Sequence, residues 1–319
     1  MLAKVKKIDF HTHFIPKAYK NFLKDNFNDL ADGVKTPEWT VEDHLNLMEE
    51  ENITHSIISL SSPHPSHATK NECLKLISEI NKEGLNLVKN HSNDFSYVAS
   101  LPLPYINESL TTIDNLKNEV IGFSFPTNSK GQYLGNEKLN PVMQKLNDIK
   151  SLAFIHPTEP YEQNIEAGKN IKTPLMEFFF DTTRTLANMA ESNIFTKYPN
   201  IIWIIPHAGA LIPIIAQRIS EGNKFLSKNE IYSPDNLLQI MNNQNIYFDL
   251  AGMVLPYQLP TLLQITSSDH FLYGSDFPYT PIHVIDGLAQ QLEETKLITE
   301  IEKQDIFYKN AEKLLGGKF

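Results

Sequence analysis

The feature that most constrains the fold of this chain is a regular alternation between short apolar stretches and longer segments with helical spacing. The short stretches are rich in β-branched and aromatic residues, which is typical of buried strands. Eight of them cover residues 4–13, 54–61, 97–103, 119–126, 151–157, 201–207, 246–252 and 270–278. Between them lie segments with helix-start signals, such as the one in which Thr40 stands three residues before Asp43.

Strands that are apolar throughout and alternate with helices indicate a parallel sheet covered by helices. Eight such units predict an α/β fold of the (β/α)8 TIM-barrel type. No linker or internal repeat divides the sequence, so we expect a single barrel domain over residues 1–319. Two connections are long, residues 14–39 and 158–173. We expect these βα-loops to cover the C-terminal face, where barrel enzymes hold their active sites.

Composition excludes several classes of protein. The formal net charge of -10 argues against a nucleic-acid partner, because phosphate-binding surfaces are basic. The single cysteine, Cys73, excludes an internal disulfide and a thiolate metal cluster, and we expect it to be a buried thiol. The N-terminus lacks a signal-peptide pattern, and no apolar run reaches the length of about 18 residues typical of a membrane span. We therefore expect a soluble, cytoplasmic protein with no membrane partner.

Histidine and aspartate residues stand at the C-terminal ends of four predicted strands. His11 and His13 end the first strand, in DFHTH, and residues two apart on a strand point to the same side. The other three are His156 in FIHP, His207 in IIPHAG and Asp276 in YGSDFP. Side chains from strand ends converge above the axis of a barrel, so these residues are expected to meet there.

Three imidazoles and one carboxylate suit a zinc or manganese ion that leaves a coordination position open. Each residue also has an ordinary alternative role. His156 precedes Pro157 and fits a turn, and Asp276 fits a turn or cap in its G-S-D-x-P context. Five coincidences at the correct ends of four strands explain the pattern less well than one shared metal site.

The set H-x-H, HP, PHAG and GSDFP resembles the amidohydrolase superfamily, in its branch of aminocarboxymuconate-semialdehyde decarboxylase-like proteins. The resemblance runs from residue 8 to about residue 315 and includes SLPLP, TKYPNIIWIIPHAGALIP and NAEKLL. It implies that His207 is the acid/base residue and that one divalent metal ion is bound by His11, His13, His156 and Asp276. The fourth strand ends in GFSFPT, without the modified lysine of many binuclear relatives, which implies a single ion.

The resemblance also implies an activity. Our first hypothesis is a metal-dependent decarboxylase of a small aromatic or unsaturated carboxylic acid, such as a substituted salicylate, with His207 as proton donor or shuttle. The alternative is a metal-dependent hydrolase or hydratase of a lactone, amide or enol acid, in which Asp276 or His207 moves protons. A barrel that only binds its ligand would lack at least one of the five residues, and all five are present.

Three further residues are candidates for substrate contact. Arg218 matches an arginine that binds the substrate carboxylate in the decarboxylase branch and reaches in from a neighbouring subunit, which implies a homodimer. A surface ion pair is its alternative role. Trp39 and Phe179 are candidates for an apolar wall beside an aromatic ring, with barrel packing as the alternative. Relatives that act on aminocarboxymuconate semialdehyde have a further arginine in the first long loop, where this chain offers only Lys35 and Trp39, which favours a smaller substrate.

Three other polar residues, Arg184, Asp9 and Asp249, are given a structural role or none. Arg184 is expected to pair with Asp181, three residues earlier on the same helix. Asp9 lies one layer deeper than His11, and we expect a packing or hydrogen-bonding role for it. Asp249, near the end of the seventh strand, receives no role from the sequence.

Overall fold

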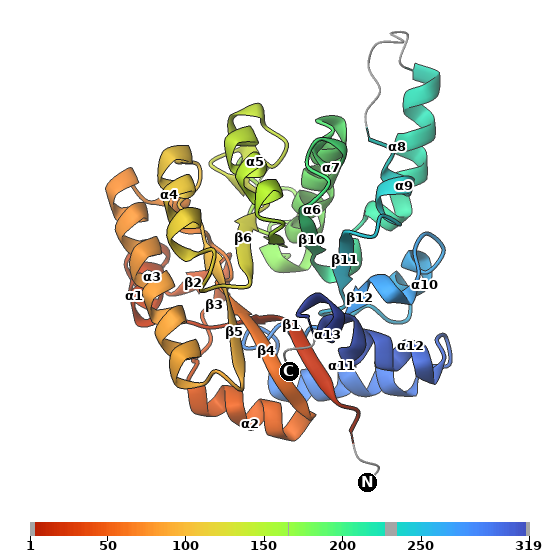
Figure 1. Cartoon of the computed structure of the whole chain (residues 1–319), viewed down its shortest axis with the longest axis horizontal. Helices are drawn as coiled ribbons and strands as arrows, with labels where there is room; N and C mark the ends of the chain where they lie inside the picture. The colour runs from red at the N-terminus through yellow and green to blue at the C-terminus, as the bar shows by residue number, and fades with distance from the viewer. Residues whose placement is uncertain (1–3, 165, 227–234, 317–319) are drawn as a thin grey trace.

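The computed structural model describes residues 4–164, 166–226 and 235–316 (Figure 1). Its centre is a parallel sheet in which eight strands follow one another in chain order. The strands are β1 (Lys7–His13), β4 (Ile53–Ser59), β5 (Phe95–Ser100), β6 (Gly122–Pro126), β9 (Leu152–His156), β10 (Ile202–Ile205), β11 (Ile246–Asp249) and β12 (Phe271–Leu272). The eight predicted strands and the (β/α)8 barrel are confirmed.

Backbone hydrogen bonds join the first strand to the segment that follows the last one. The N–H of His13 donates to the carbonyl of Phe277 at 2.7 Å, and the N–H of Asp276 donates to the carbonyl of His11 at 2.8 Å. These bonds bring the two ends of the barrel sheet together. They also hold DFHTH beside GSDFP, although the two motifs are separated by most of the sequence.

Helices surround the sheet, as Figure 1 shows. The predicted cap of the second helix is confirmed, because the Thr40 hydroxyl accepts a hydrogen bond from the N–H of Asp43 at 3.0 Å. Among the described residues, no helix combines the length and apolar character needed to cross a lipid bilayer. The helices are α1 (Lys17–Phe27), α2 (Val41–Glu51), α3 (Lys70–Asn90), α4 (Ile106–Leu116), α5 (Asn140–Asp148), α6 (Thr173–Glu191), α7 (Ile194–Lys197), α8 (Ile212–Leu226), α9 (Leu237–Ile240), α10 (Gln258–Leu262), α11 (Ile282–Glu294), α12 (Glu300–Gln304) and α13 (Asn310–Leu314).

The first long connection, predicted as a loop, contains regular structure. Helix α1 forms there because Tyr19, Phe22 and Leu23 recur at helical spacing and are buried. A short hairpin follows, built from β2 (Leu30–Ala31) and β3 (Val34–Lys35). A second hairpin after β6 pairs β7 (Asn128–Ser129) with β8 (Gln132–Tyr133). The connection before α6 has no helix or strand among its described residues.

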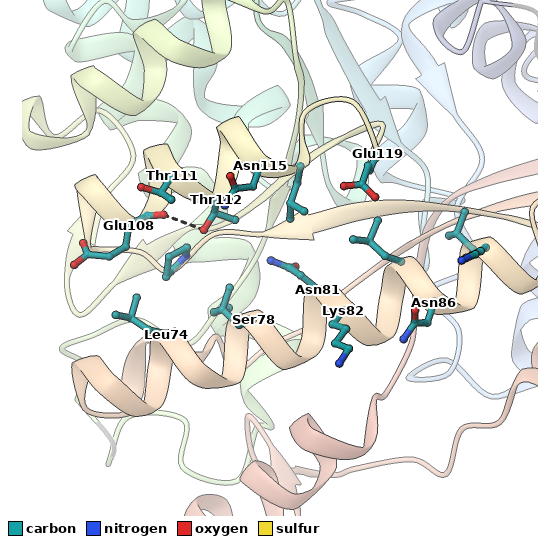
Figure 2. A pocket seen from close by; sticks show the side chains of 16 residues that line it. Leu74, Ser78, Asn81, Lys82, Asn86, Glu108, Thr111, Thr112, Asn115 and Glu119 are labelled. Carbon is teal, nitrogen blue, oxygen red and sulfur yellow. Dashed lines mark hydrogen bonds between the residues drawn. The ribbon is translucent and has the colours of Figure 1, made fainter.

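A groove of about 850 Å³ lies between α3 and α4, as Figure 2 shows. Its side chains are a mixture of small polar and apolar groups, including Ser78, Asn81 and Thr111. One of its hydroxyls is already used within α4, because Thr112 donates to the carbonyl of Glu108 at 2.9 Å. None of the five predicted metal-site residues lines this groove.

Cys73 is buried in α3 with a free thiol, as predicted. Burial raises the pKa of this thiol to about 11, so the thiolate form is disfavoured. The predicted structural role fits both observations.

Candidate metal centre

The five histidine and aspartate residues predicted from the strand ends come together in space. The ring of His11 is central, with its centroid 4.9 Å from those of His13 and His207 and 5.6 Å from that of His156. The carboxylate oxygen Oδ1 of Asp276 lies 3.6 Å from Nε2 of His11 and 3.4 Å from Nε2 of His13. The convergence expected above the barrel axis is therefore observed.

The ligand atoms in this cluster are close enough to share one ion. Nitrogen atoms of His11, His13 and His156 lie within 4.8 Å of one another. A second overlapping group combines His11 with His207 and Asp276 within the same limit. Nε2 of His11 and Nε2 of His13 are buried and have no hydrogen-bond partner, a costly arrangement for polar atoms. A divalent cation held between them would satisfy both nitrogen atoms, so the site fits a metal ion.

Hydrogen bonds to Nδ1 set the orientation of the imidazoles. His11 directs Nδ1 to Oδ2 of Asp249 at 2.8 Å, and His156 directs Nδ1 to the carbonyl of Pro157 at 2.7 Å. Nδ1 of His13 lies 3.2 Å from the hydroxyl of Ser59. For His11 and His13, Nε2 is the nitrogen left facing Asp276, which is the arrangement that outer hydrogen-bond partners impose on metal-binding histidines.

Asp249 is the residue of this site to which the sequence assigned no role. Besides its contact with His11, its Oδ1 accepts hydrogen bonds from the N–H groups of His207 at 3.0 Å and Ala251 at 3.2 Å. The carboxylate is buried at the end of β11. The sequence feature that could have identified Asp249 is its position near the end of a predicted apolar strand, which it shares with His156.

Asp9 has the hydrogen-bonding role expected for it. Its Oδ1 accepts from the N–H groups of His11 and Ser275, both at 3.1 Å. These bonds fix the backbone of the two motifs that supply His11 and Asp276. The second oxygen of Asp9 has no partner, and burial raises the pKa of this carboxyl to about 7.

The backbone at the sixth and eighth strand ends is left-handed. His207 has a φ of 52° and Asp276 a φ of 59°, values uncommon for residues other than glycine. Two residues before Asp276, position 274 requires glycine, because a Cβ atom on Gly274 would lie 2.6 Å from Cβ of His11. Backbone strain of this kind is found where the surrounding structure must aim a side chain.

Two carboxylates dominate the electrostatics of the cluster. Burial alone would lower the pKa of His11, but the adjacent Asp249 raises it to about 9. Burial alone would raise the pKa of Asp276, but the imidazole of His13, with Nε2 3.4 Å from Oδ1, and the charge of His11 hold this pKa well below its usual range. Asp276 is therefore ionised at neutral pH and can attract a cation.

The other three imidazoles are neutral at neutral pH. Burial lowers the pKa of His13, His156 and His207, and the positive charge of His11 lowers each of them further. Neutral imidazole is the form that binds a metal ion or accepts a proton.

Two aromatic rings of α6 pack against histidines of the cluster. The ring of Phe179 stacks on that of His207, with centroids 6.1 Å apart and planes at 25°. Its neighbour Phe178 packs edge-on against His156 at 6.2 Å. Helix α6 therefore presents two successive aromatic rings to two different histidines of the site.

Trp39 has contacts of the packing type. Its ring packs against Phe14 at 6.1 Å, and its Nε1 donates to Nδ1 of His44 at 3.2 Å. These contacts are of the kind expected in the packing alternative given for Trp39.

The two arginines lie on different helices. Arg184 on α6 lies 3.1 Å from Oδ1 of Asp181, as predicted. Arg218 lies on α8 and is exposed. Figure 1 shows α8 projecting away from the barrel.

Known proteins match this chain over nearly its whole length. Residues 8–317 match the family described as Amidohydrolase. Decarboxylase macB of Penicillium terrestre is 31% identical, with 90% of this chain and 88% of that protein aligned. The 6-methylsalicylic acid decarboxylase of Penicillium expansum is 25% identical, with 93% of each chain aligned.

Solved structures match the fold equally completely. A crystal structure of an amidohydrolase II is 40% identical, with a TM-score of 0.92 and coverage of 98% of this chain and 100% of that one. The dihydroxybenzoic acid decarboxylase of Polaromonas sp. JS666, solved with manganese and 2-nitroresorcinol, has a TM-score of 0.84 at 20% identity. The two chains are covered to 98% and 97%. At that identity the likeness establishes the shared barrel.

Proposed function

This chain belongs to the amidohydrolase family, and we propose that within that family it is a metal-dependent decarboxylase of a small aromatic carboxylic acid. The observation that carries the proposal is the pair of buried, unpartnered Nε2 atoms of His11 and His13 beside the ionised Asp276. The decarboxylases among its relatives, aligned over most of both chains, support the choice of reaction.

In this proposal His11, His13, His156 and Asp276 hold one divalent ion, manganese or zinc. When bound, the ion supplies Lewis acidity and orients an anionic substrate through its oxygen atoms. The residues around the ion would fix which face of the substrate meets His207. The two overlapping groups of ligand atoms, which have His11 in common, support a shared site for one ion.

The reaction needs a proton at the ring carbon that bears the carboxylate. A new carbon–hydrogen bond forms there, the bond to the carboxylate breaks, its electron pair returns to the ring, and CO₂ leaves. We assign the proton transfer to His207, with Asp276 close enough to influence the charge of its imidazole. Because its lowered pKa leaves His207 neutral at neutral pH, the imidazole would first accept the acidic proton of the substrate and then pass it to the ring carbon, and the lowered pKa makes this protonated form a stronger acid.

Phe179 is proposed to face the aromatic ring of the substrate. Its stacking on His207 places an apolar ring beside the proposed proton donor. Moving an aromatic substrate from water to a position next to these two rings would be favourable in free energy, because flat apolar surfaces pack well against one another. Trp39 would then act indirectly, through Phe14 and His44.

We further propose a cytoplasmic homodimer in which Arg218 contacts the substrate carboxylate of the neighbouring subunit. Arginine is suited to this role because its planar guanidinium binds a carboxylate through two hydrogen bonds. Two large apolar side chains on the same helix, Ile214 and Phe225, are 64% and 83% exposed. Exposed apolar residues around an exposed arginine support a protein interface on α8.

The test is product analysis with metal-loaded protein. Protein freed of metal by chelation is loaded separately with manganese and with zinc, and is then offered hydroxybenzoates, muconate-type acids, lactones and amides. Release of CO₂ with formation of the corresponding phenol, abolished in His156→Ala and His207→Ala, supports the proposal. A product that has gained water instead would overturn the decarboxylase assignment.

A further inference from the structure

Four successive residues after β10 have positive φ angles, although only one of them is glycine. The values are 52° for His207, 53° for Ala208, 78° for Gly209 and 54° for Ala210. Residues with a side chain rarely adopt this conformation, and it persists only where the surrounding structure holds it. The turn over residues 207–210 begins with the proposed proton carrier, so the contacts that hold the turn also orient the imidazole of His207.

Gln258, the first residue of α10, binds both ends of this turn. Its Nε2 donates to the carbonyl of His207 at 2.5 Å and to the carbonyl of Ala210 at 3.2 Å. The nitrogen of a side-chain amide carries two hydrogens, so both bonds can form at once. The carbonyl of His207 also accepts the N–H of Ala210 at 3.0 Å. Gln258 therefore reinforces the backbone bond that closes the turn.

The backbone of His207 is thus held by side chains on both of its polar groups. Its N–H donates to Oδ1 of Asp249 at 3.0 Å, and its carbonyl accepts from Gln258. Asp249 ends β11 and Gln258 begins α10, so both side chains flank the same connection. This connection also passes close to the imidazole ring, because a Cβ atom on Gly252 would lie 3.9 Å from Cδ2 of His207.

The helix that carries Gln258 is anchored in the core. Leu259 and Leu262 on α10 are fully buried, and the N–H of Leu259 donates to the carbonyl of Val254 at 2.8 Å. Buried leucines of this kind fix the start of a short helix through apolar packing. The amide of Gln258 therefore acts from a fixed position, which a donor needs if it is to keep a strained turn from relaxing.

We propose that Gln258 is a positioning residue that aims the imidazole of His207 at the substrate. This inference rests on the proposed function, in which His207 delivers a proton to the ring carbon. Displacing a catalytic group by about 1 Å can lower a rate by about 100-fold. Both hydrogen bonds of the Gln258 nitrogen end on the turn and not on the four proposed metal ligands. Loss of the amide should therefore affect proton transfer and leave metal binding intact.

Three variants separate the hydrogen-bond donor from the bulk of the side chain. Gln258→Met keeps the length of the side chain but has no N–H group. Gln258→Glu keeps its shape but turns carboxylate oxygens toward two carbonyl oxygens, and Gln258→Lys restores a donor. The matched control is Gln264→Met, which makes the first of these exchanges at an exposed glutamine six residues further along the chain.

Steady-state kinetics and chelator titration measure the effect on the manganese-loaded enzyme. The kcat should fall by about 10- to 100-fold in Gln258→Met and Gln258→Glu, whereas KM and metal affinity should stay within about 3-fold of the wild type. Gln258→Lys should have a higher kcat than Gln258→Met, and Gln264→Met should match the wild type. A wild-type kcat in Gln258→Met, no gain in Gln258→Lys, or an equal loss of metal affinity would overturn the positioning role.

Nuclear magnetic resonance of the zinc-loaded protein, labelled with ¹⁵N at histidine, tests the positioning role without a reaction. The ring signals of His207 are identified by their absence in His207→Ala. They should shift in Gln258→Met and not in Gln264→Met, while those of His13 and His156 keep their positions. If no acid is decarboxylated but the His207 signals depend on Gln258 in this way, the proposed function fails and the positioning role stands. If decarboxylation occurs and neither kcat nor the His207 signals depend on Gln258, the positioning role fails alone.

Discussion

Nδ1 of His11 lies 2.8 Å from Oδ2 of Asp249, and the other oxygen of the same carboxylate accepts the backbone N–H of His207 at 3.0 Å. One buried carboxylate on β11 thus holds a proposed metal ligand by its side chain and the proposed acid/base residue by its backbone. Asp249 contacts neither reacting atoms nor the ion in our proposal. It is a positioning residue that couples the two halves of the site.

Replacing Asp249 by asparagine should weaken metal binding. The amide keeps the size of the side chain, but its NH₂ group can donate to Nδ1 of His11 and so favour the tautomer that carries a proton on Nε2. Changes to such outer partners typically cost about 10- to 100-fold in metal affinity. Competitive chelator titration measures this loss directly. The matched control is Asp269→Asn, at a 65% exposed carboxylate, which should bind metal like the wild type.

The fold and the proposed ligand set could both be predicted from the sequence because both depend on local patterns. Strand periodicity and motif order are local signals, and a barrel topology brings strand ends together whatever their separation along the chain. Asp249 escaped prediction because its role depends on a contact with His11, 238 residues away, which no local pattern records. The placement of Trp39 against Phe14 and His44 depends in the same way on the packing of the first loop.

Removal of the ion should abolish activity and leave the barrel folded. The strands are held by apolar side chains such as Phe123, Trp203 and Phe248, all buried, and by the backbone bonds that close the sheet. After chelation we expect an unchanged far-ultraviolet circular dichroism spectrum and loss of CO₂ release. Manganese or zinc should restore activity in the wild type but not in His13→Ala. Unfolding on chelation would contradict this view of the core.

Phe179→Ala should lower kcat/KM by roughly 10-fold, because truncating a stacked aromatic ring removes an interaction worth about 1 kcal/mol or more beside His207. The next residue provides the control. Phe180 is 44% exposed, and Phe180→Ala should leave kcat/KM within about twofold of the wild type. Steady-state kinetics on both variants measures the two changes in kcat/KM. Equal effects would mean that α6 acts as a whole and that the stacking contact has no special role.

Stability should fall as the pH falls from about 6.5 toward 4. Burial lowers the pKa of His44 and of His64 to about 3 each, whereas both are near 6.5 in the unfolded chain. Between these pH values the unfolded chain binds more protons than the folded one. The free energy of unfolding therefore increases as the pH rises and decreases on acidification. Each such histidine contributes a slope of about 1.4 kcal/mol per pH unit within this window.

Urea unfolding of the metal-free protein at several pH values measures this slope. His64→Gln can preserve the hydrogen bond to the carbonyl of Leu101, now 3.0 Å from Nε2, while removing the titrating ring. The slope should therefore decrease in His64→Gln and stay unchanged in His283→Gln, because His283 is exposed. An unchanged slope in His64→Gln would mean that other groups cause the acid sensitivity.

Arg218 should act in the active site of the neighbouring subunit, and mixing two inactive variants tests this. His207→Ala and Arg218→Ala are each expected to be nearly inactive as homodimers. In a mixed dimer, one site would contain both defects and the other would contain neither, because the arginine comes from the opposite chain. Random exchange makes half of the dimers mixed, so about a quarter of all sites should regain activity. Recovery of CO₂ release after joint unfolding and refolding of the two variants would establish the shared site. If Arg218 serves its own subunit, every site in the mixture keeps one defect and no activity returns.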